Sequence, residues 1–372
     1  KIAFDHTIFL IQKYGGISRY FLELQKKLQL KNNIKICCPI YLNNNISTRK
    51  NVFKFLKLES IPRYSTKLLN RSNYIFNEIY FNFWKPDIIH KTYFNDYKYN
   101  YKKAKKIINV WDLSHEIYHY MYDKSSDWRP KKDSLKNIDH IICSSKKTQD
   151  DLINFYNIDL NKTSVIYQGT PNITETGLNL NLDFKFFLYV GSRKKYKNFK
   201  LILKAFNLNK YFLENFKLIC FGYEKFEKDE IELMNKLKID KEKIKLFSGN
   251  DEILVSLYKN AEALIYPSLN EGFGFPPLEA MKFGCPVVTS NNPAIKEAVG
   301  NCGFYFDPKD EKSLANSLEK LINSKDEREL KRKDGFQRAN LFNWDKTSQD
   351  ILKLYEKILT FLNLINIVNN FF

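Results

Sequence analysis

The sequence predicts an α/β protein built from two doubly wound domains. The chain has 372 residues, which exceeds one ordinary core and suits two domains of roughly 150–200 residues. Short apolar runs alternate with amphipathic stretches in both halves, as in parallel sheets with crossover helices. A polar stretch without a clear period, PNITETGLNLNLDF, interrupts this pattern at Pro171. We therefore expect one domain over 1–172, a linker over 173–184 and a second domain over 185–344.

Each half supplies its own set of predicted elements. In the first half the strands are IKICCPIYL, DIIH, KIINVWDL, HIICSS and TSVIYQG, and the helices include ISRYFLELQKKLQL and KKTQDDLINFYN. The second half begins with KFFLYVGS and the helix NFKLILKAFNLN, followed by the strands FKLICFG, IKLFSG, ALIYPS and PVVTS. Doubly wound domains place ligand sites at the carboxyl ends of their strands.

Composition narrows the class of protein. A hydrophobic fraction of 44% with 27% charged residues is typical of a soluble globular protein, and no apolar run reaches the ~18 residues of a membrane span. The N-terminus lacks signal-peptide features, and six scattered cysteines form no metal-like spacing. These observations predict a cytoplasmic protein with reduced thiols. The net charge of +18 favours anionic partners, although a general bias toward lysine explains it equally well.

The stretch EGFGFPPLEAM carries the most informative chemistry. Strand ALIYPS ends just before Glu271, and we expect a helix to begin near Leu278, with Glu279 in its first turn. Gly272 and Gly274 permit close approach of a ligand to the backbone, and the helix N-terminus favours negative charge. Carboxylates accept paired hydrogen bonds from neighbouring hydroxyls, as sugars and riboses offer. An ordinary helix start with acidic residues is the structural alternative.

This stretch resembles the Glu-x7-Glu signature of the retaining glycosyltransferases of family 4, which have the GT-B fold. Further matching stretches follow in the family's order: YGGISRYFLEL, DHIICSSKKTQDDL, LYVGSRKKYKNF, VGNCGFYFDP and FNWDKTSQDILKLY. The resemblance covers nearly the whole chain. It implies two Rossmann-like domains that face each other across a cleft, and a C-terminal helix within 345–372 that crosses back to the first domain.

The resemblance also implies roles for individual residues. Glu271 would contact the donor sugar and Glu279 the donor ribose, while the turn amides of Gly272, Phe273, Gly274 and Phe275 would meet sugar or phosphate. Arg193 and Lys197 match the family's basic pair. Fixed cations stabilise the charge that develops on a departing diphosphate, so the chemistry asks for such a pair.

The first domain offers weaker candidates. Gly15 and Gly16 lie between a strand and a helix, where their amides could approach a diphosphate, although the pair lacks the full G-x-G-x-x-G pattern. Where many family members place a histidine before the aspartate of NVWDLSHEIYH, this chain has Trp111, which leaves that histidine's role unassigned. Asp112 and His115 are the nearest catalytic candidates. The candidate acceptor contacts are Arg19, His90 and Tyr93.

The resulting functional hypothesis is a glycosyltransferase that moves a sugar from a GDP-mannose-like or UDP-sugar donor to a glycan or lipid-linked saccharide, with retention. The chain has no Asp-x-Asp, so we expect neither a metal nor another cofactor. Two alternatives stay open: a transferase acting on DNA bases, and a catalytically inactive sugar-binding module. The lysine- and tyrosine-rich segment 97–106 fits nucleic acid, anionic lipid or a solvated loop. The apolar tail from Ile358 to Phe372 fits a packed helix or a weak contact with an anionic membrane.

Overall fold

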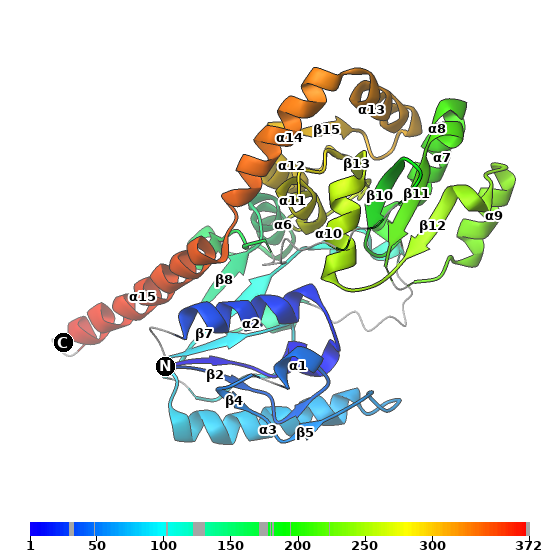
Figure 1. Ribbon diagram of the computed structural model, residues 1–372. Coiled ribbons are helices and arrows are strands. Elements are labelled where there is room, and N and C mark those ends of the chain that lie inside the picture. Colours follow the sequence, from blue (N-terminus) through cyan, green and yellow to red (C-terminus); the bar gives the residue numbers. More distant parts are fainter. Residues whose placement is uncertain are drawn as a thin grey trace.

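The computed structural model describes residues 1–29, 33–47, 49–101, 103–121, 131–170, 178, 180, 182–193, 195–222 and 224–369, with the backbone alone over 361–369. Two parallel sheets form the centres of two α/β domains, and the last long helix extends away from the second domain along the first (Figure 1). The predicted fold class is confirmed.

The first domain is built on a seven-stranded sheet in the order β4-β2-β1-β6-β7-β8-β9. All its pairs are parallel, and Phe4 lies opposite both Ile36 and His90. One face packs against α2 and the C-terminal helix α15 (Trp344–Asn369), and the other packs against α3, α5 and α6. The strands are β1 (Ile2–Phe4), β2 (Ile34–Cys37), β4 (Val52–Phe53), β6 (Ile88–Lys91), β7 (Lys105–Val110), β8 (His140–Cys143) and β9 (Thr163–Val165). The helices are α1 (Thr7–Ile11), α2 (Gly16–Leu28), α3 (Thr66–Trp84), α4 (Ser114–Ile117), α5 (Lys131–Leu135) and α6 (Lys146–Tyr156).

The second domain is built on a six-stranded parallel sheet in the order β12-β11-β10-β13-β14-β15. One face packs against α7, α8, α9 and α13, and the other against α10, α11, α12 and α14. The strands are β10 (Phe186–Val190), β11 (Lys217–Phe221), β12 (Ile244–Phe247), β13 (Ala263–Tyr266), β14 (Val287–Ser290) and β15 (Gly303–Phe306). The helices are α7 (Lys200–Leu208), α8 (Lys210–Asn215), α9 (Lys228–Lys236), α10 (Asp251–Asn260), α11 (Phe275–Lys282), α12 (Pro293–Val299), α13 (Glu311–Asn323) and α14 (Lys325–Asn340).

The predicted strand IKICCPIYL is in fact two strands, so that prediction was wrong in one detail. Pro39 lacks an N–H and interrupts the ladder, and β3 (Ile40–Tyr41) leaves the main sheet to pair with β5 (Leu56–Lys57). The strands β1, β4, β5 and β15 and the long helix α3 are absent from the sequence-based prediction.

The end of the first domain lies beside the start of the helix that returns to it. The helix α15 (Trp344–Asn369) starts after the second domain and inserts Trp344, Ile351 and Tyr355 into the core of the first. Beside its start, Thr170 donates from its N and Oγ1 to the Phe342 carbonyl, at 2.9 and 3.1 Å. Of the expected linker over 173–184, only 178, 180 and 182–184 are described, and the tail side chains from 361 onward lie outside the description.

Direct contacts join the domains elsewhere. Glu297 on α12 accepts hydrogen bonds from the backbone N of Lys146 and Lys147 at 2.7 and 2.8 Å, so a carboxylate of one domain meets the positive N-terminus of α6 in the other. Arg19 on α2 forms an ion pair of 3.0 Å with Asp251 on α10. Among the described helices, none is long and apolar enough to cross a bilayer.

Candidate active site

The carboxyl ends of the central strands β10 and β13 bring a lysine and a glutamate together. Lys197 follows β10, and its Nζ donates to Oε1 of Glu271 at 2.8 Å. Tyr266, the last residue of β13, donates its hydroxyl to the same oxygen at 2.7 Å. Lys197 and Glu271 side chains are 23% and 11% exposed, so the cluster is largely shielded yet remains accessible. The resemblance assigned these two residues to the donor site separately, and in the structure they form an ion pair.

The loops that carry this cluster are fastened to each other. Asn198 adopts a left-handed backbone conformation (φ 58°), and its Nδ2 donates to the carbonyls of Pro267 and Pro308 at 3.2 and 2.8 Å. The Leu269 N–H donates to the Tyr196 carbonyl at 2.8 Å. These bonds hold the turn after β10 against the turn after β13, and thereby fix Lys197 beside Glu271.

The ion pair determines the charge of Lys197. Burial favours the neutral amine, but the Glu271 carboxylate outweighs burial and raises the pKa of Lys197 above its ordinary value. Asp112 of the first domain acts in the same direction. Lys197 is therefore a permanent cation at the carboxyl edge of the sheet.

The glycine turn leads into α11 earlier than expected. The helix begins at Phe275, with Gly274 as its N-cap at φ 109° and proline in the first turn. The first N–H groups of a helix have no partner within the helix, so Pro276 and Pro277, which lack an N–H, fit at the start of α11. The expected start near Leu278 was therefore wrong, and Glu279 lies in the second helical turn rather than the first.

The turn residues lie against the first domain. The Gly272 carbonyl accepts a hydrogen bond from Ser144 Oγ at 2.8 Å, and a Cβ built on Gly272 would overlap the carbonyl oxygen of Trp111. Phe273 is buried and stacks on Tyr167, with ring centroids 5.3 Å apart. Here the missing side chain of Gly272 permits close approach of the other domain's backbone.

Glu279 lies on α11, apart from the Lys197–Glu271 pair, and contacts α10 instead. Tyr258 on α10 donates its hydroxyl to Glu279 Oε2 at 3.1 Å. Burial raises the pKa of Glu279 to about 7, and the nearby Arg19 of the first domain only partly offsets this effect. The carboxyl is therefore poised to gain or lose a proton near neutral pH.

The first domain contributes Asp112 and His115 from the loop and short helix after β7. Burial alone would raise the pKa of Asp112, but the Lys131 ammonium and the Ser114 N–H, which donates to Oδ1 at 2.8 Å, bring it below its usual value. Burial and Lys131 lower the pKa of His115. Lys131 also donates to the Asp112 carbonyl at 2.6 Å and pairs with buried Glu116 at 2.8 Å, which braces the loop.

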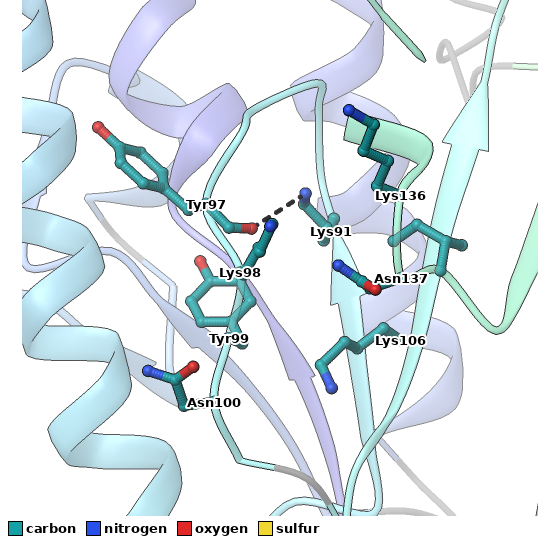
Figure 2. A pocket seen from close by; sticks show the side chains of 9 residues that line it. Lys91, Tyr97, Lys98, Tyr99, Asn100, Lys106, Lys136 and Asn137 are labelled. Atoms are coloured by element: carbon teal, nitrogen blue, oxygen red, sulfur yellow. Dashed lines mark hydrogen bonds between the residues drawn. The ribbon is translucent and has the colours of Figure 1, made fainter. Parts of the chain in front are cut away.

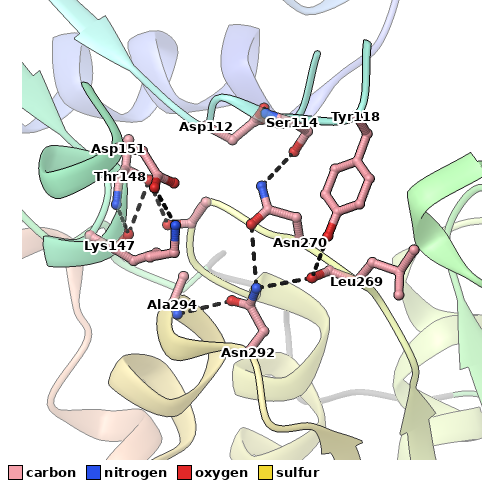
Figure 3. A network of polar contacts seen from close by, with 12 residues as sticks. Asp112, Ser114, Tyr118, Lys147, Thr148, Asp151, Leu269, Asn270, Asn292 and Ala294 are labelled. Atoms are coloured by element: carbon pink, nitrogen blue, oxygen red, sulfur yellow. Dashed lines mark hydrogen bonds and ion pairs between the residues drawn. The ribbon is translucent and has the colours of Figure 1, made fainter. Parts of the chain in front are cut away.

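Amide side chains that the sequence analysis overlooked bridge the two domains (Figure 3). Asn270 donates from Nδ2 to the Ser114 hydroxyl at 3.1 Å, and Asn292 donates to Asn270 Oδ1 at 3.3 Å. Tyr118 reaches across to the Leu269 carbonyl at 3.4 Å. In the sequence, Asn270 and Asn292 are marked only by their position just after the predicted strands ALIYPS and PVVTS, a position that many asparagines share.

Arg193 lies apart from this cluster. Its Nε donates to Glu230 Oε1 at 3.0 Å, and its Nη2 donates to the carbonyls of Glu224 and Lys225. The Arg193 and Glu230 side chains are 2% and 4% exposed, so they form a buried ion pair inside the second domain. The predicted contact between Arg193 and the diphosphate stays a prediction without a supporting contact.

The remaining first-domain candidates are distributed over the fold. His90 is completely buried between Tyr355 Oη and Asn109 Oδ1, each 2.6 Å away, and burial lowers its pKa to about 4. Gly15 caps α2, and no atom lies near a Cβ built on Gly16. Tyr93 is partly buried, and burial near Asp112 raises its pKa to about 12. The proposed acceptor roles of His90 and Tyr93 stay predictions, as does that of Arg19.

Comparison with known families identifies the two halves. Residues 14–171 match the family described as Glycosyltransferase Family 4, and residues 174–338 match Glycosyl transferases group 1. The chain carries the domain pair of a family 4-type glycosyltransferase. Retention of configuration is not part of what these matches establish.

Two curated relatives are named as O-antigen chain mannosyltransferases. The chain is 30% identical over 191 residues to the O-antigen chain mannosyltransferase RfbU of Salmonella typhimurium, covering 51% of this chain and 53% of the relative. It is 31% identical over 171 residues to O-antigen chain mannosyltransferase B of Escherichia coli, covering 45% of each. The chain thus spans about half the length of these relatives.

Solved structures support the GT-B fold across the whole chain. A sucrose-phosphate synthase from Thermosynechococcus elongatus superposes with a TM-score of 0.75 over 96% of this chain and 99% of that one, at 19% identity. Anabaena Alr3699/HepE in complex with UDP-glucose superposes with a TM-score of 0.73 over 96% and 99%, at 14% identity. At these identities the likeness establishes the fold alone.

Proposed function

We propose that the protein transfers a hexose from a nucleoside diphosphate sugar to a saccharide acceptor. The observation that carries the proposal is the Lys197–Glu271 pair at the carboxyl ends of two adjacent central strands, close to Asp112 of the other domain. A sugar nucleotide needs a cation for its diphosphate, a carboxylate that accepts hydrogen bonds from the sugar hydroxyls and a second carboxylate for the ribose. Lys197, Glu271 and Glu279 can supply these three groups.

The donor binds with its sugar near Glu271 and its ribose near Glu279. Glu271 Oε1 already accepts two hydrogen bonds, so Oε2 is the oxygen available to sugar hydroxyls. Lys197 stabilises the charge that develops on the diphosphate as the glycosidic bond breaks. Its anchoring to Glu271 couples the position of the cation to the position of the sugar.

The acceptor is a glycan or lipid-linked saccharide held by the first domain, where Asp112 and His115 approach the donor. The names of two curated relatives, both O-antigen chain mannosyltransferases, support mannose and a polysaccharide acceptor. A UDP-sugar is the other donor to consider, because Alr3699/HepE is solved with UDP-glucose. Retention of configuration belongs to this proposal through the family resemblance.

Metal independence is the next part of the proposal. Lys197 supplies a fixed positive charge at the place where a metal ion would otherwise neutralise the diphosphate. Over the described ranges, no group of three or more His, Cys, Asp and Glu side chains is placed to hold a metal ion. Turnover should survive EDTA. Activity that is lost with EDTA and restored by magnesium or manganese would contradict this part.

We place the activity in the cytoplasm, at or near a membrane face that presents the acceptor. The six cysteines are buried and unpaired, which fits a reducing compartment.

A thermal-shift screen of GDP-, UDP-, ADP- and dTDP-sugars tests the proposed function. A donor at ~100 times its dissociation constant adds about 2.7 kcal/mol of stability. Lys197→Ala should lose this shift, whereas Lys228→Ala, which changes an exposed lysine on α9, should retain it. Slow hydrolysis of the stabilising donor then separates a transferase from an inactive binding module. If no sugar nucleotide raises the melting temperature, the proposed function is wrong.

A further inference from the structure

The helix α3 buries polar side chains over most of its length and exposes apolar ones. Its buried side carries Asn70, Asn73 and Asn77, followed by Phe81 and Trp84 toward its C-terminus. Asn73 is fully satisfied there, because its Nδ2 and Oδ1 bond the carbonyl and the N–H of Ile40, each at 2.8 Å. Asn77 donates from Nδ2 to Nδ1 of His6 at 3.0 Å. The helix therefore joins the domain through amides along most of its length and through Phe81 and Trp84 near its C-terminus.

The outward side of α3 is strongly apolar. Phe83 is 85% exposed, Leu68 67% and Ile79 65%. Ile75, Ile79 and Phe83 follow one another at intervals of four residues, with Phe76 beside them, and Leu68 lies seven residues before Ile75. The patch continues onto the strand β5 segment, where Phe55 is exposed and its ring contacts Phe76, with centroids 6.5 Å apart. We call this surface the α3 face. It comprises Phe55, Leu56, Tyr64, Leu68, Ile75, Phe76, Ile79 and Phe83. Single exposed apolar residues are common in proteins, but a contiguous face marks an interaction surface.

The segment that carries the α3 face has an excess of positive charge. Over residues 54–85 the chain carries six basic side chains and only two acidic ones. The basic residues are Lys54, Lys57, Arg63, Lys67, Arg71 and Lys85, and the acidic ones are Glu59 and Glu78. An apolar stripe flanked by lysine and arginine is the pattern of helices that lie in the interface of an anionic membrane.

A lysine-lined pocket lies against the flank of the same helix (Figure 2). It has a volume of about 300 Å³, and its lining includes Lys91, Lys98, Lys106 and Lys136 but no carboxylate. Its rim is bound to α3, because Tyr74 stacks on Tyr97 with centroids 4.7 Å apart and donates to the Lys98 carbonyl at 2.7 Å. The pocket and the α3 face therefore belong to one side of the domain.

Carboxylates neutralise the lysines of the pocket only in part, because Glu78 acts on Lys106 and Asp133 on Lys98 and Lys136 without lining the pocket. Lys91 is buried, and its Nζ donates to the Asn95 carbonyl at 2.9 Å; burial lowers its pKa to about 8, and Asp5 and Asp96 oppose this without lining the pocket. Lys136 pairs with Asp133, but both side chains are more than half exposed, where such a pair contributes little. The pocket therefore favours a phosphate group.

We propose that the first domain docks on an anionic lipid bilayer through the α3 face, with the lysine-lined pocket receiving lipid headgroup phosphate. The apolar side chains enter the boundary between headgroups and acyl chains, and the flanking basic residues meet the surface charge. This inference extends the proposed function by naming the surface on which a lipid-linked acceptor would be presented. It assigns membrane contact to α3 and not to the tail from Ile358 to Phe372.

Sedimentation with vesicles of phosphatidylcholine, alone or mixed with phosphatidylglycerol, tests the inference. The full chain should bind the mixed vesicles at least tenfold more tightly than the neutral ones, and binding should weaken with salt. Ile79→Ser/Phe83→Ser should reduce binding at least tenfold, whereas Leu208→Ser/Leu330→Ser, which changes exposed leucines of the second domain, should not. Truncation after Lys357 should leave binding unchanged.

A second pair of variants tests the pocket. Lys98→Glu/Lys136→Glu should abolish the preference for phosphatidylglycerol, while Lys228→Glu, at an exposed site in the second domain, should preserve it. Nucleoside diphosphate affinity, measured on every variant, reports folding and the proposed function separately from membrane binding. The inference is overturned if the full chain binds neither vesicle, or if the α3 variant binds as well as the unchanged protein. It is also overturned if the α3 face instead mediates a concentration-dependent dimer without lipid binding.

Discussion

Replacing Glu279 by glutamine should change the proton balance of nucleotide binding. Because burial raises the pKa of Glu279 to about 7, about half of the free molecules carry a proton there at pH 7. A carboxylate that accepts two ribose hydroxyls is stabilised in its ionised form. Binding should therefore release about 0.5 proton per site at pH 7, and Glu279→Gln should remove this release.

The same pKa predicts how affinity depends on pH. The ionised fraction of a carboxyl with a pKa of about 7 rises from about one in eleven at pH 6 to about ten in eleven at pH 8. The dissociation constant of the nucleoside diphosphate should fall about tenfold over that range for this reason alone. The direction follows from the raised pKa, because a carboxyl at its ordinary value would already be ionised at pH 6.

Calorimetry in two buffers of different ionisation enthalpy measures the released protons directly. The ligand's own terminal phosphate also titrates near pH 6, so the informative quantity is the difference between the unchanged protein and Glu279→Gln with the same ligand. A difference near zero at pH 7 would refute the reasoning. It would mean either that Glu279 does not contact the nucleotide or that it is already ionised.

Three further substitutions distinguish a residue that acts in the reaction from residues that maintain the structure. Glu271→Gln should lower turnover by roughly 10²–10³ while leaving affinity for the bare nucleoside diphosphate nearly unchanged, and equal loss of both in kinetics and calorimetry would contradict this. Gly272→Ala should force the domains apart at Trp111, at a cost of about 1–3 kcal/mol typical of overpacking, and small-angle scattering identical to that of the unchanged protein would count against it. Arg193→Ala should destabilise the second domain by about 3–5 kcal/mol in urea unfolding, because it leaves Glu230 buried without its partner. Lost nucleotide binding at unchanged stability would instead place the Arg193 guanidinium in the site.

The fold was predictable because its signals are repeated many times. Each apolar run such as HIICSS became a parallel strand, and the break at Pro171 separated two complete sheets. The exceptions have local causes. Pro39 split one strand, and α3 was not predicted because most of its buried positions, up to Asn77, carry asparagines where the helical pattern predicts apolar residues.

The site was predictable only through the family resemblance, which identified Lys197 from the basic pair and Glu271 from the Glu-x7-Glu signature. Lys197 and Glu271 are 74 positions apart, yet strand order brings β10 beside β13 and so places them in contact. The partner of Arg193 could not be predicted, because Glu230 lies in an amphipathic helix among several equivalent acidic residues. The contacts of Tyr266 and Asn270 could not be predicted either, because Tyr266 bonds Glu271 on the neighbouring loop and Asn270 bonds Ser114 in the other domain.

The bonds around the start of α15 constrain how the two domains can move relative to each other. Thr170 donates to the Phe342 carbonyl, and Thr347 donates to the Tyr167 carbonyl at 2.9 Å, so the end of the first domain is fastened to the chain on both sides of Trp344. His90 bonds Tyr355 further along α15, which anchors that helix in the core of the first domain. A rotation of the second domain should therefore bend the chain just before Phe342, next to these bonds. Opening and closing about this point should return Lys197 and Glu271 to the same position relative to Asp112.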